Sequence, residues 1–161
     1  MIRKATLNDL EKVMSLYKEA REYMVSNGNP TQWDHIDHPS KEFITQNIKD
    51  DILYVGEEGE TIYLVFSFKI GEDPSYIEIK EGKWLDNETE YGVIHTLAGK
   101  EGYKNCFEEC LRFCEQFTNH FRGDTHENNK KMRYLYSKYG FKCCGIVTLT
   151  NGEDRLGFEK I

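Results

Sequence analysis

No apolar run in this sequence of 161 residues approaches the ~20 consecutive residues that a membrane-spanning helix needs. Positive charge is also scarce: 21 Lys and Arg face 28 Asp and Glu, which gives a formal net charge of −7. Because like charges repel, this balance disfavours non-specific binding to nucleic acid or to an anionic membrane. The N-terminal segment turns polar at once and shows no apolar stretch of a secretory leader. We therefore expect a cytoplasmic protein with no nucleic-acid partner and no membrane association.

The five cysteines lack the spacing of a disulfide framework or of a metal site. Their number is odd, and no Cys-x-x-Cys pair or neighbouring Cys/His partner is present. Cys106, Cys110 and Cys114 recur every four residues, so they share one face of a predicted helix. Because free cysteine usually packs as a small hydrophobe, we expect these three in the core, no bound metal and a reducing compartment. A thiol-redox or metal protein built on them is a third-ranked alternative.

Apolar residues make up 39% of the sequence and aromatic residues 13%, which is enough to fill a core. The length is typical of one globular domain. No repeat, low-complexity tract or interdomain linker interrupts the sequence. We therefore predict a single α+β domain over residues 1–161.

Hydrophobic periodicity predicts helices and strands in the order β α α β β β α β α β β. The helices are expected to start after a capping box at residues 6–9, after Ser40, near residue 106 and at Asn128 or Asn129. Phe43 in the second helix and Phe117 at the end of the third are expected to point inward. The strands in this order cover residues 2–5, 52–55, 61–70, 92–98, 122–125, 141–150 and 154–161, and a further short strand over residues 76–80 is expected in the polar segment that follows the third of them.

Two polar segments are harder to assign to regular structure. Residues 71–90 are polar and mixed, and we interpret them as an insertion or an active-site flap. Residues 31–39 form an expected loop with Trp33, His35 and His38, which is placed to line a substrate pocket. The two histidines lack a third ligand for a metal ion.

The segment DTHENNKKMRYLYSKYGFKCCG, residues 124–145, resembles a strand-to-helix segment of the GNAT acetyltransferase superfamily. In that segment an Asn is followed seven residues later by a Tyr and then by Gly-Phe, and here the places are held by Asn129, Tyr136, Gly140 and Phe141. The opening IRKATLNDLEKVMSLY is similar to the family's first strand and helix. The resemblance covers nearly the whole chain, and it points to a small bacterial GNAT-like N-acetyltransferase.

This resemblance implies both a fold and an activity. The fold is a central mixed, mostly antiparallel sheet with a splay between strands 4 and 5 and helices on both faces. The activity is transfer of an acetyl group from acetyl-CoA, as co-substrate, to a primary amine of a small molecule or peptide, by direct attack in a ternary complex. The acceptor itself is not readable, although an acidic surface is compatible with cationic amines.

The resemblance assigns the pantetheine arm of acetyl-CoA to the strand over residues 92–98. Backbone groups left unpaired at the splay would pair with the amides of the arm like an added strand. The N–H near His95 would polarise the thioester carbonyl, and Leu97 would bond the arm through its backbone. Asn129 would bond the arm or simply cap its helix.

Two residues are candidates for proton transfer. By resemblance Tyr136 protonates the leaving CoA thiolate, and the alternative is a core aromatic beside Met132 and Tyr139. A Glu that serves as base in some family members is replaced here by Tyr91. His95 lies on the same strand face and titrates near neutrality, so we nominate it as base or water anchor, against a purely structural histidine.

The phosphate-binding loop departs from the family pattern of Arg or Gln, two residues, Gly, one residue, then Gly or Ala. In register the candidate cofactor-binding residues are Gly102, Tyr103, Lys104, Asn105, Cys106 and Phe107. Backbone donors survive because no Pro intrudes, Asn tolerates a left-handed φ, and Lys100 and Lys104 supply charge. Phe107 either obstructs the cofactor or points into the core beside Leu111.

This departure keeps an alternative function open: a non-catalytic GNAT-like ligand-binding or interaction module. The oligomeric state is also open, and a homodimer paired through edge strands of the C-terminal hairpin is compatible with the resemblance.

Overall fold

The computed structural model describes residues 1–26 and 39–161, so the loop predicted to carry Trp33, His35 and His38 lies outside the described residues. The chain forms two compact units. Unit 1 comprises Met1–Phe68 and Ile94–Phe113, and unit 2 comprises Lys69–Val93 and Cys114–Ile161. The single domain over residues 1–161 stays a prediction.

Four helices and seven strands make up the described structure. The helices are α1 (Leu10–Ser26), α2 (Lys41–Lys49), α3 (Cys106–Cys114) and α4 (Lys130–Lys138), with 3-10 turns at Leu7–Asp9 (η1) and Pro74–Tyr76 (η2). The strands are β1 (Ile2–Lys4), β2 (Leu53–Glu58), β3 (Thr61–Ile70), β4 (Gly92–Gly99), β5 (Phe121–Thr125), β6 (Lys142–Thr148) and β7 (Asp154–Lys160). Their order in the sheet is β1-β2-β3-β4-β5-β7-β6.

The expected α+β fold class is confirmed. The neighbouring strand pairs β1–β2, β2–β3, β5–β7 and β6–β7 are all antiparallel. The parallel pair is β4–β5, at the place of the expected splay, with Gly92 opposite Phe121 and Val93 opposite Arg122. In the described residues no helix is long and apolar enough to cross a membrane.

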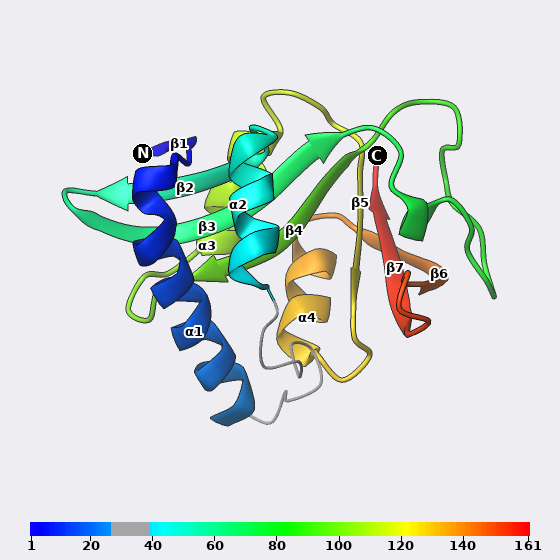
Figure 1. Ribbon diagram of the computed structural model, residues 1–161. Coiled ribbons are helices and arrows are strands. Elements are labelled where there is room, and N and C mark those ends of the chain that lie inside the picture. Colours follow the sequence, from blue (N-terminus) through cyan, green and yellow to red (C-terminus); the bar gives the residue numbers. More distant parts are fainter. Residues whose placement is uncertain (27–38) are drawn as a thin grey trace. The chain divides into compact units, whose positions relative to one another are not determined.

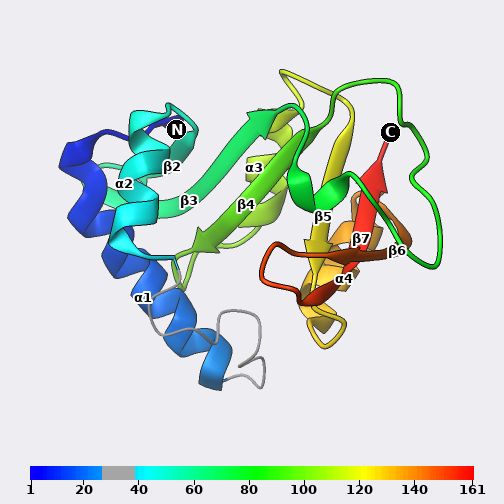
Figure 2. The same ribbon diagram turned by 45° about the vertical axis from the view of Figure 1, so that its right-hand side comes forward.

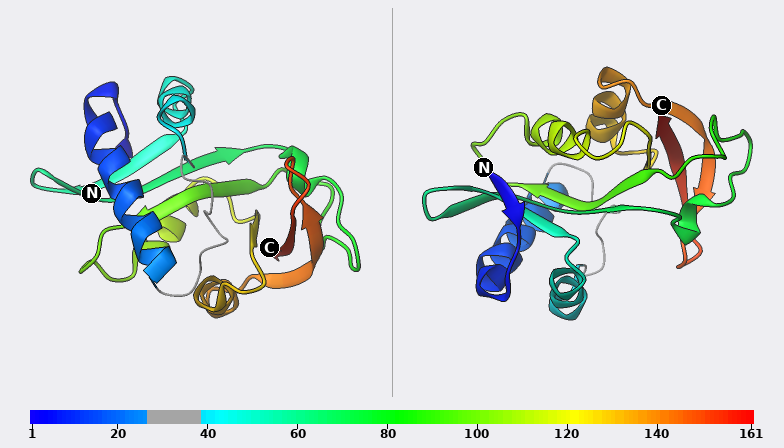
Figure 3. Two further views of the ribbon diagram at one scale, coloured as in Figure 1. Left: turned by 60° about the horizontal axis from the view of Figure 1, so that its bottom comes forward. Right: turned by 90° about the horizontal axis from the view of Figure 1, so that it is seen from above.

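In unit 1, α1 and α2 lie on one face of β2 and β3, and α3 lies on the other (Figure 1 and the right panel of Figure 3). The strand between these layers is β3, in which every residue from Ile62 to Phe68 is buried. This confirms the prediction from its nearly continuous apolar run, which is typical of a strand covered on both faces. Cys110 of α3 is also fully buried, as expected for a small core hydrophobe, whereas Cys106 is only half-buried, so the prediction that it lies in the core is wrong.

The start of α1 is fixed by an acid–base contact. Arg3 donates to both carboxylate oxygens of Asp9, at 2.8 and 2.9 Å, and the Thr6 N–H donates at 2.7 Å, which is the expected Asp9 half of the capping box. These bonds, the Arg3 bonds above all, lower the pKa of Asp9 to about 2.

Asp9→Asn is expected to remove an acid-sensitive part of the stability, on the order of 1–2 kcal/mol. Because the pKa is depressed in the folded chain, the contribution is complete above about pH 4 and is lost as the pH falls towards about 2. Urea unfolding at about pH 6 and about pH 3 measures it. The wild type should lose more free energy of unfolding between these values than Asp9→Asn, and equal losses would contradict the assignment.

In unit 2, β5, β7 and β6 form an antiparallel sheet against which α4 packs (Figure 2). The β6–β7 hairpin turns at Asn151-Gly152, as predicted, and Gly152 has a φ of +90°. Gly140 follows α4, also with a φ of +90°, which confirms it as the residue that ends the helix. Tyr136 of α4 stacks on Phe158 of β7, with ring centroids 4.6 Å apart.

The strand predicted over residues 76–80 is wrong. Pro74 begins the 3-10 turn η2, and the Asp73 carboxylate caps it by accepting the Ser75 N–H at 2.9 Å. Only Lys80 forms a β-bridge, to Ile146. A capped turn that begins at Pro74 thus ends at Tyr76, where the strand was expected to begin.

Two residues expected to point inward are exposed instead. Phe43 is 45% exposed because the buried face of α2 is formed by Ile44, Asn47 and Ile48, while Phe43 follows the capping Ser40 on another face. Phe117 is 55% exposed because α3 ends at Cys114, so the helical periodicity no longer applies to it.

Candidate functional site

Strand β4 contains one extra residue relative to β3. The Gly71 N–H donates to Tyr91 O at 3.0 Å, and the Lys100 N–H donates to Tyr63 O at 2.7 Å. Between these bonds the chain advances eight residues from Tyr63 to Gly71 but nine from Tyr91 to Lys100. The two numbers would be equal in a regular pair, so β4 carries a β-bulge.

The bulge is located at Thr96, which has a φ of +51°. A β-branched residue in this left-handed region is an outlier, because its side chain crowds the backbone. The Thr96 hydroxyl is in addition buried without a hydrogen-bond partner among the described residues. Strain of this kind persists where the surrounding structure imposes it, and it clusters at functional sites.

Side-chain hydroxyls hold both carbonyl groups at the bulge. Ser67 of β3 donates from Oγ to His95 O at 3.2 Å, and Tyr17 of α1 donates from Oη to Thr96 O at 2.9 Å. Tyr17 has no exposed surface, and burial raises its pKa, so the hydroxyl stays protonated. The half-buried side chains of His95 and Leu97, the two predicted site residues on β4, flank Thr96 in sequence.

The loop between β4 and α3 forms a compact turn in unit 1. Tyr103 stacks on Tyr63 with ring centroids 4.7 Å apart, and the Tyr103 N–H donates to Lys100 O at 3.1 Å. Gly102 has a φ of +92° and Asn105 a φ of +62°, so Asn105, which stands at a glycine position of the family pattern, adopts a left-handed conformation. Lys104 is exposed.

Helix α3 begins directly after this turn, and its first-turn N–H groups have no acceptor within the helix. The Asn105 carbonyl accepts the Glu109 N–H at 3.0 Å, which makes Asn105 the residue that caps the helix. Cys106 is half-buried, and its Sγ lies 3.8 Å from Tyr103 O. Phe107 is only 6% exposed, so of the two alternatives for its ring the structure favours the core.

Phe107→Leu is expected to destabilise the protein by about 1 kcal/mol, because a buried ring is replaced by a smaller side chain. It should not tighten binding of CoA, because the ring does not lie in front of the loop. Thermal unfolding and titration with CoA check the two parts. A variant that binds CoA at least ten times more tightly would show that Phe107 obstructs the loop after all.

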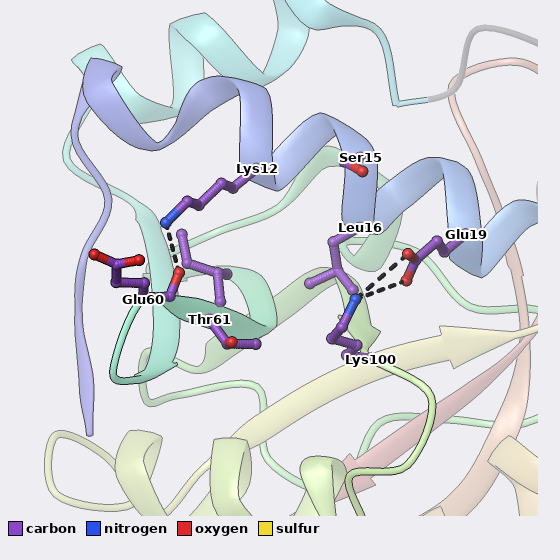
Figure 4. A pocket seen from close by; sticks show the side chains of 8 residues that line it. Lys12, Ser15, Leu16, Glu19, Glu60, Thr61 and Lys100 are labelled. Carbon is purple, nitrogen blue, oxygen red and sulfur yellow. Dashed lines mark hydrogen bonds and ion pairs between the residues drawn. The ribbon is translucent and has the colours of Figure 1, made fainter.

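A hollow of about 220 Å³ in unit 1 lies beside the same loop, and it contains none of the predicted site residues (Figure 4). It is lined by Lys12, Ser15, Leu16, Glu19, Glu60, Thr61, Ile62 and Lys100. Its charged groups bond within the protein: Lys12 Nζ to Glu60 O at 2.5 Å, and Lys100 Nζ to the Glu19 carboxylate at 3.4 Å. Lys100, expected to supply charge to the loop, is thus paired with an acid of α1.

In unit 2, the predicted residues of α4 make contacts of their own. Asn129 Oδ1 accepts the Met132 N–H at 3.0 Å, so Asn129 caps the helix. The Tyr136 hydroxyl donates to Asp124 O at 3.2 Å, at the end of β5, and the side chain is 7% exposed. Gly123 leaves room for it, because a Cβ there would lie 2.5 Å from the Tyr136 hydroxyl oxygen.

Sequence reasoning missed a buried ionic cluster in unit 2. Glu159 has no exposed surface, and it accepts from His120 Nε2 at 2.6 Å, from Arg122 Nε at 3.1 Å and from the Leu85 N–H at 2.5 Å. Arg122 also donates to the carbonyls of Tyr76 and Asp86, at 2.8 and 2.7 Å. The cluster therefore ties the polar segment 71–90 to β5 and β7.

The Arg122 guanidinium lies between two aromatic rings, 4.3 Å from the centroid of Trp84 and 4.3 Å from that of Tyr91. A second contact from the same segment joins the Tyr76 hydroxyl to the Asp124 carboxylate. Burial, with the neighbouring Asp124 charge, raises the pKa of Tyr76, which keeps the hydroxyl as the donor. Charged residues within two predicted strands, such as Arg122 and Glu159, were the available sequence signal.

Metal-ligating side chains do not gather in the described part of the chain: among residues 1–26 and 39–161 no group of three or more His, Cys, Asp or Glu could hold a metal ion. The five cysteines are all thiols, and Cys110 and Cys114 are buried.

No family model and no curated protein matches the sequence of this chain. Its structure is similar to an acetyltransferase of the GNAT family from Streptococcus agalactiae, with 30% sequence identity, a TM-score of 0.88 and coverage of 100% of this chain and 94% of the other.

Two further structures share the fold. A GNAT-family acetyltransferase from Listeria monocytogenes matches with 19% identity, a TM-score of 0.72 and coverage of 100% and 94% of the two chains. The NatB acetyltransferase complex bound to CoA and MES matches with 16% identity, a TM-score of 0.63 and coverage of 99% and 97%. The three structures share one fold. The family is shown by the 30% sequence identity to the streptococcal protein, which extends over the full length of this chain. The chain belongs to the GNAT acetyltransferase family.

Proposed function

We propose that the chain is an N-acetyltransferase that moves an acetyl group from acetyl-CoA to a primary amine of a small molecule or peptide, by direct attack in a ternary complex. The observation that carries the proposal is the bulge of β4 at Thr96, held in a left-handed conformation by Ser67 and Tyr17. The family resemblance assigns the pantetheine arm to this strand, and strained backbone is retained where function needs it.

The proposed co-substrate contacts in unit 1 are made by the backbone. Leu97 bonds the arm, and N–H groups near His95 bond the thioester carbonyl. The N–H groups of residues 102–107 receive the pyrophosphate at the start of α3, where the helix dipole favours negative charge. This fits the observed loop, because Asn105 has the left-handed φ and the Phe107 ring is buried.

In the reaction, a bond forms between the amine nitrogen and the thioester carbonyl carbon, and the carbon–sulfur bond breaks. Tyr136 donates its hydroxyl proton to the leaving thiolate, and His95, directly or through water, takes the extra proton of the amine. Asn129 caps α4 with Oδ1, as observed, and donates to the arm from Nδ2. These roles are transferred from the family to the matching positions.

Two measurements test the proposal. Isothermal titration with acetyl-CoA should give measurable heat at submillimolar concentration. Incubation with acetyl-CoA and spermidine, an aminoglycoside or a peptide with a free N-terminus should give an acetylated product by mass spectrometry. Absence of heat at millimolar acetyl-CoA would contradict the proposal and favour a non-catalytic module.

That second candidate, a GNAT-like binding or interaction module, is favoured by the charges at the loop. Lys100 pairs with Glu19, and the first turn of α3 holds Glu108 and Glu109. Carboxylates near the loop oppose a bound pyrophosphate. The same titration separates the candidates, because a module that no longer uses acetyl-CoA gives no heat.

A further inference from the structure

We propose that Tyr17 and Ser67 are positioning residues, which aim two consecutive backbone N–H groups of β4, those of Thr96 and Leu97, at the thioester carbonyl oxygen. This inference rests on the proposed function and deepens it. Nothing in the family pattern of the sequence points to either side chain. Both side chains and the two N–H groups belong to unit 1.

Each of the two hydrogen bonds fixes the direction of one peptide group. A trans peptide places its N–H opposite its carbonyl. The His95 carbonyl accepts from Ser67 Oγ at 3.2 Å, so the Thr96 N–H points away from Ser67. The Thr96 carbonyl accepts from Tyr17 Oη at 2.9 Å, so the Leu97 N–H points away from Tyr17.

The φ of Thr96 determines how the two N–H groups are oriented relative to each other. In an extended strand successive N–H groups point to opposite sides. For a non-glycine residue a φ of +51° is allowed only with a left-handed helical ψ. Successive peptide groups are then roughly parallel, as in a helix turn, so the N–H groups of Thr96 and Leu97 point to one side. Such a pair forms a small anion-binding concavity.

The conformation at Thr96 is energetically costly. A left-handed β-branched residue and its buried, unpartnered hydroxyl are each unfavourable. The bond from Tyr17 joins residues 79 positions apart in sequence and is made by a side chain with no exposed surface. Two hydroxyls on one side of β4 therefore stabilise a conformation that the strand would not adopt by itself.

The two N–H groups have a chemical role in the proposed reaction. As the amine attacks, negative charge develops on the thioester carbonyl oxygen, and fixed backbone N–H donors stabilise such charge most when they need not reorient. Tyr17 and Ser67 do not touch the oxygen in this account. They hold the carbonyl groups of His95 and Thr96 on the side of β4 opposite to the two N–H groups. Both N–H groups therefore point at the position of the thioester oxygen before acetyl-CoA binds.

The test uses acetyl-CoA labelled with carbon-13 at the carbonyl, bound to Tyr17→Phe and to Ser67→Ala, with Tyr23→Phe as matched control because Tyr23 is 51% exposed on the same helix. In the wild type the infrared carbonyl band should shift to lower frequency on binding. Both site variants should lose much of this shift and turn over about 10-fold more slowly with an unchanged KM for acetyl-CoA. The affinity for CoA, which has no acetyl carbonyl, should stay within about 2-fold of the wild type.

Other outcomes overturn the inference in distinguishable ways. If the wild type binds acetyl-CoA and both variants keep the full band shift and rate, Tyr17 and Ser67 are merely structural while the proposed function stands. If the wild type binds no acetyl-CoA, both proposals fail together. Should Tyr17→Phe not fold, Ser67→Ala still decides, because it removes one hydroxyl of β3 and leaves the ring of Tyr17 in the core.

Discussion

Tyr136→Phe is expected to lower kcat by about 100-fold or more, because a general acid in the transition state contributes at least that factor. The ring keeps its stacking on Phe158, and loss of the bond to Asp124 O should cost the fold about 1 kcal/mol. Affinity for CoA should change little. Steady-state kinetics with an accepted amine, together with a CoA titration, measure both effects.

A matched control is available on the same helix. Tyr134 is 63% exposed, so Tyr134→Phe removes a hydroxyl of the same kind without touching the packed ring of Tyr136. Gly123→Ala gives an independent check, because its Cβ would displace the Tyr136 hydroxyl, 2.5 Å away. If turnover is unchanged in Tyr136→Phe, this tyrosine is a core aromatic and has no acid role.

Glu159→Gln is expected to destabilise the protein by about 3–5 kcal/mol, the usual loss when one partner of a buried ion pair is removed. The variant keeps the shape of the side chain but leaves the Arg122 guanidinium, only 4% exposed, without its counter-charge. The N–H of Leu85 and Nε2 of His120 would then face a neutral amide. Guanidinium chloride unfolding followed by fluorescence measures the loss.

Asp154→Asn is the matched surface control for this experiment. The Lys80–Asp154 pair is about half exposed on both sides, and such pairs are worth less than about 1 kcal/mol. A loss of the same size in both variants, or a loss below about 1 kcal/mol for Glu159→Gln, would show that the cluster does not anchor the segment 71–90.

Local signals in the sequence were sufficient for much of unit 2. Asn129 caps α4, Gly140 ends it and Gly152 forms the hairpin turn, each because a single residue satisfies a requirement of the backbone within a few positions. Likewise the seven consecutive buried residues of β3 follow from its apolar run. These features depend on neighbours in sequence, which periodicity and turn chemistry can read.

The segment 71–90 was not predictable in the same way. Its conformation depends on Arg122 and Glu159, which lie 46 and 74 residues from their respective partners Tyr76 and Leu85. No rule on adjacent residues contains such a contact, so the strand predicted over residues 76–80 is wrong. The available hint was limited to an arginine and a glutamate placed within predicted strands.

The bulge of β4 was also not predictable from the sequence. Threonine favours regular strands, so nothing in the sequence near Thr96 predicts a left-handed φ. The carbonyls at the bulge accept from hydroxyls of Ser67 and Tyr17, which are contributed by another strand and by the first helix. The family resemblance placed His95 and Leu97 on the relevant strand, and their roles as base and arm contact stay predictions.

A crystal structure of the chain with CoA tests the central claim most directly. We expect the pantetheine arm to pair with β4 beyond the bulge, through the backbone of Leu97. We expect the pyrophosphate at the first N–H groups of α3, next to Asn105. If crystals grown with millimolar CoA hold the ligand elsewhere, or β4 beyond Thr96 is occupied by protein with no space for the arm, the acetyl-CoA assignment is wrong.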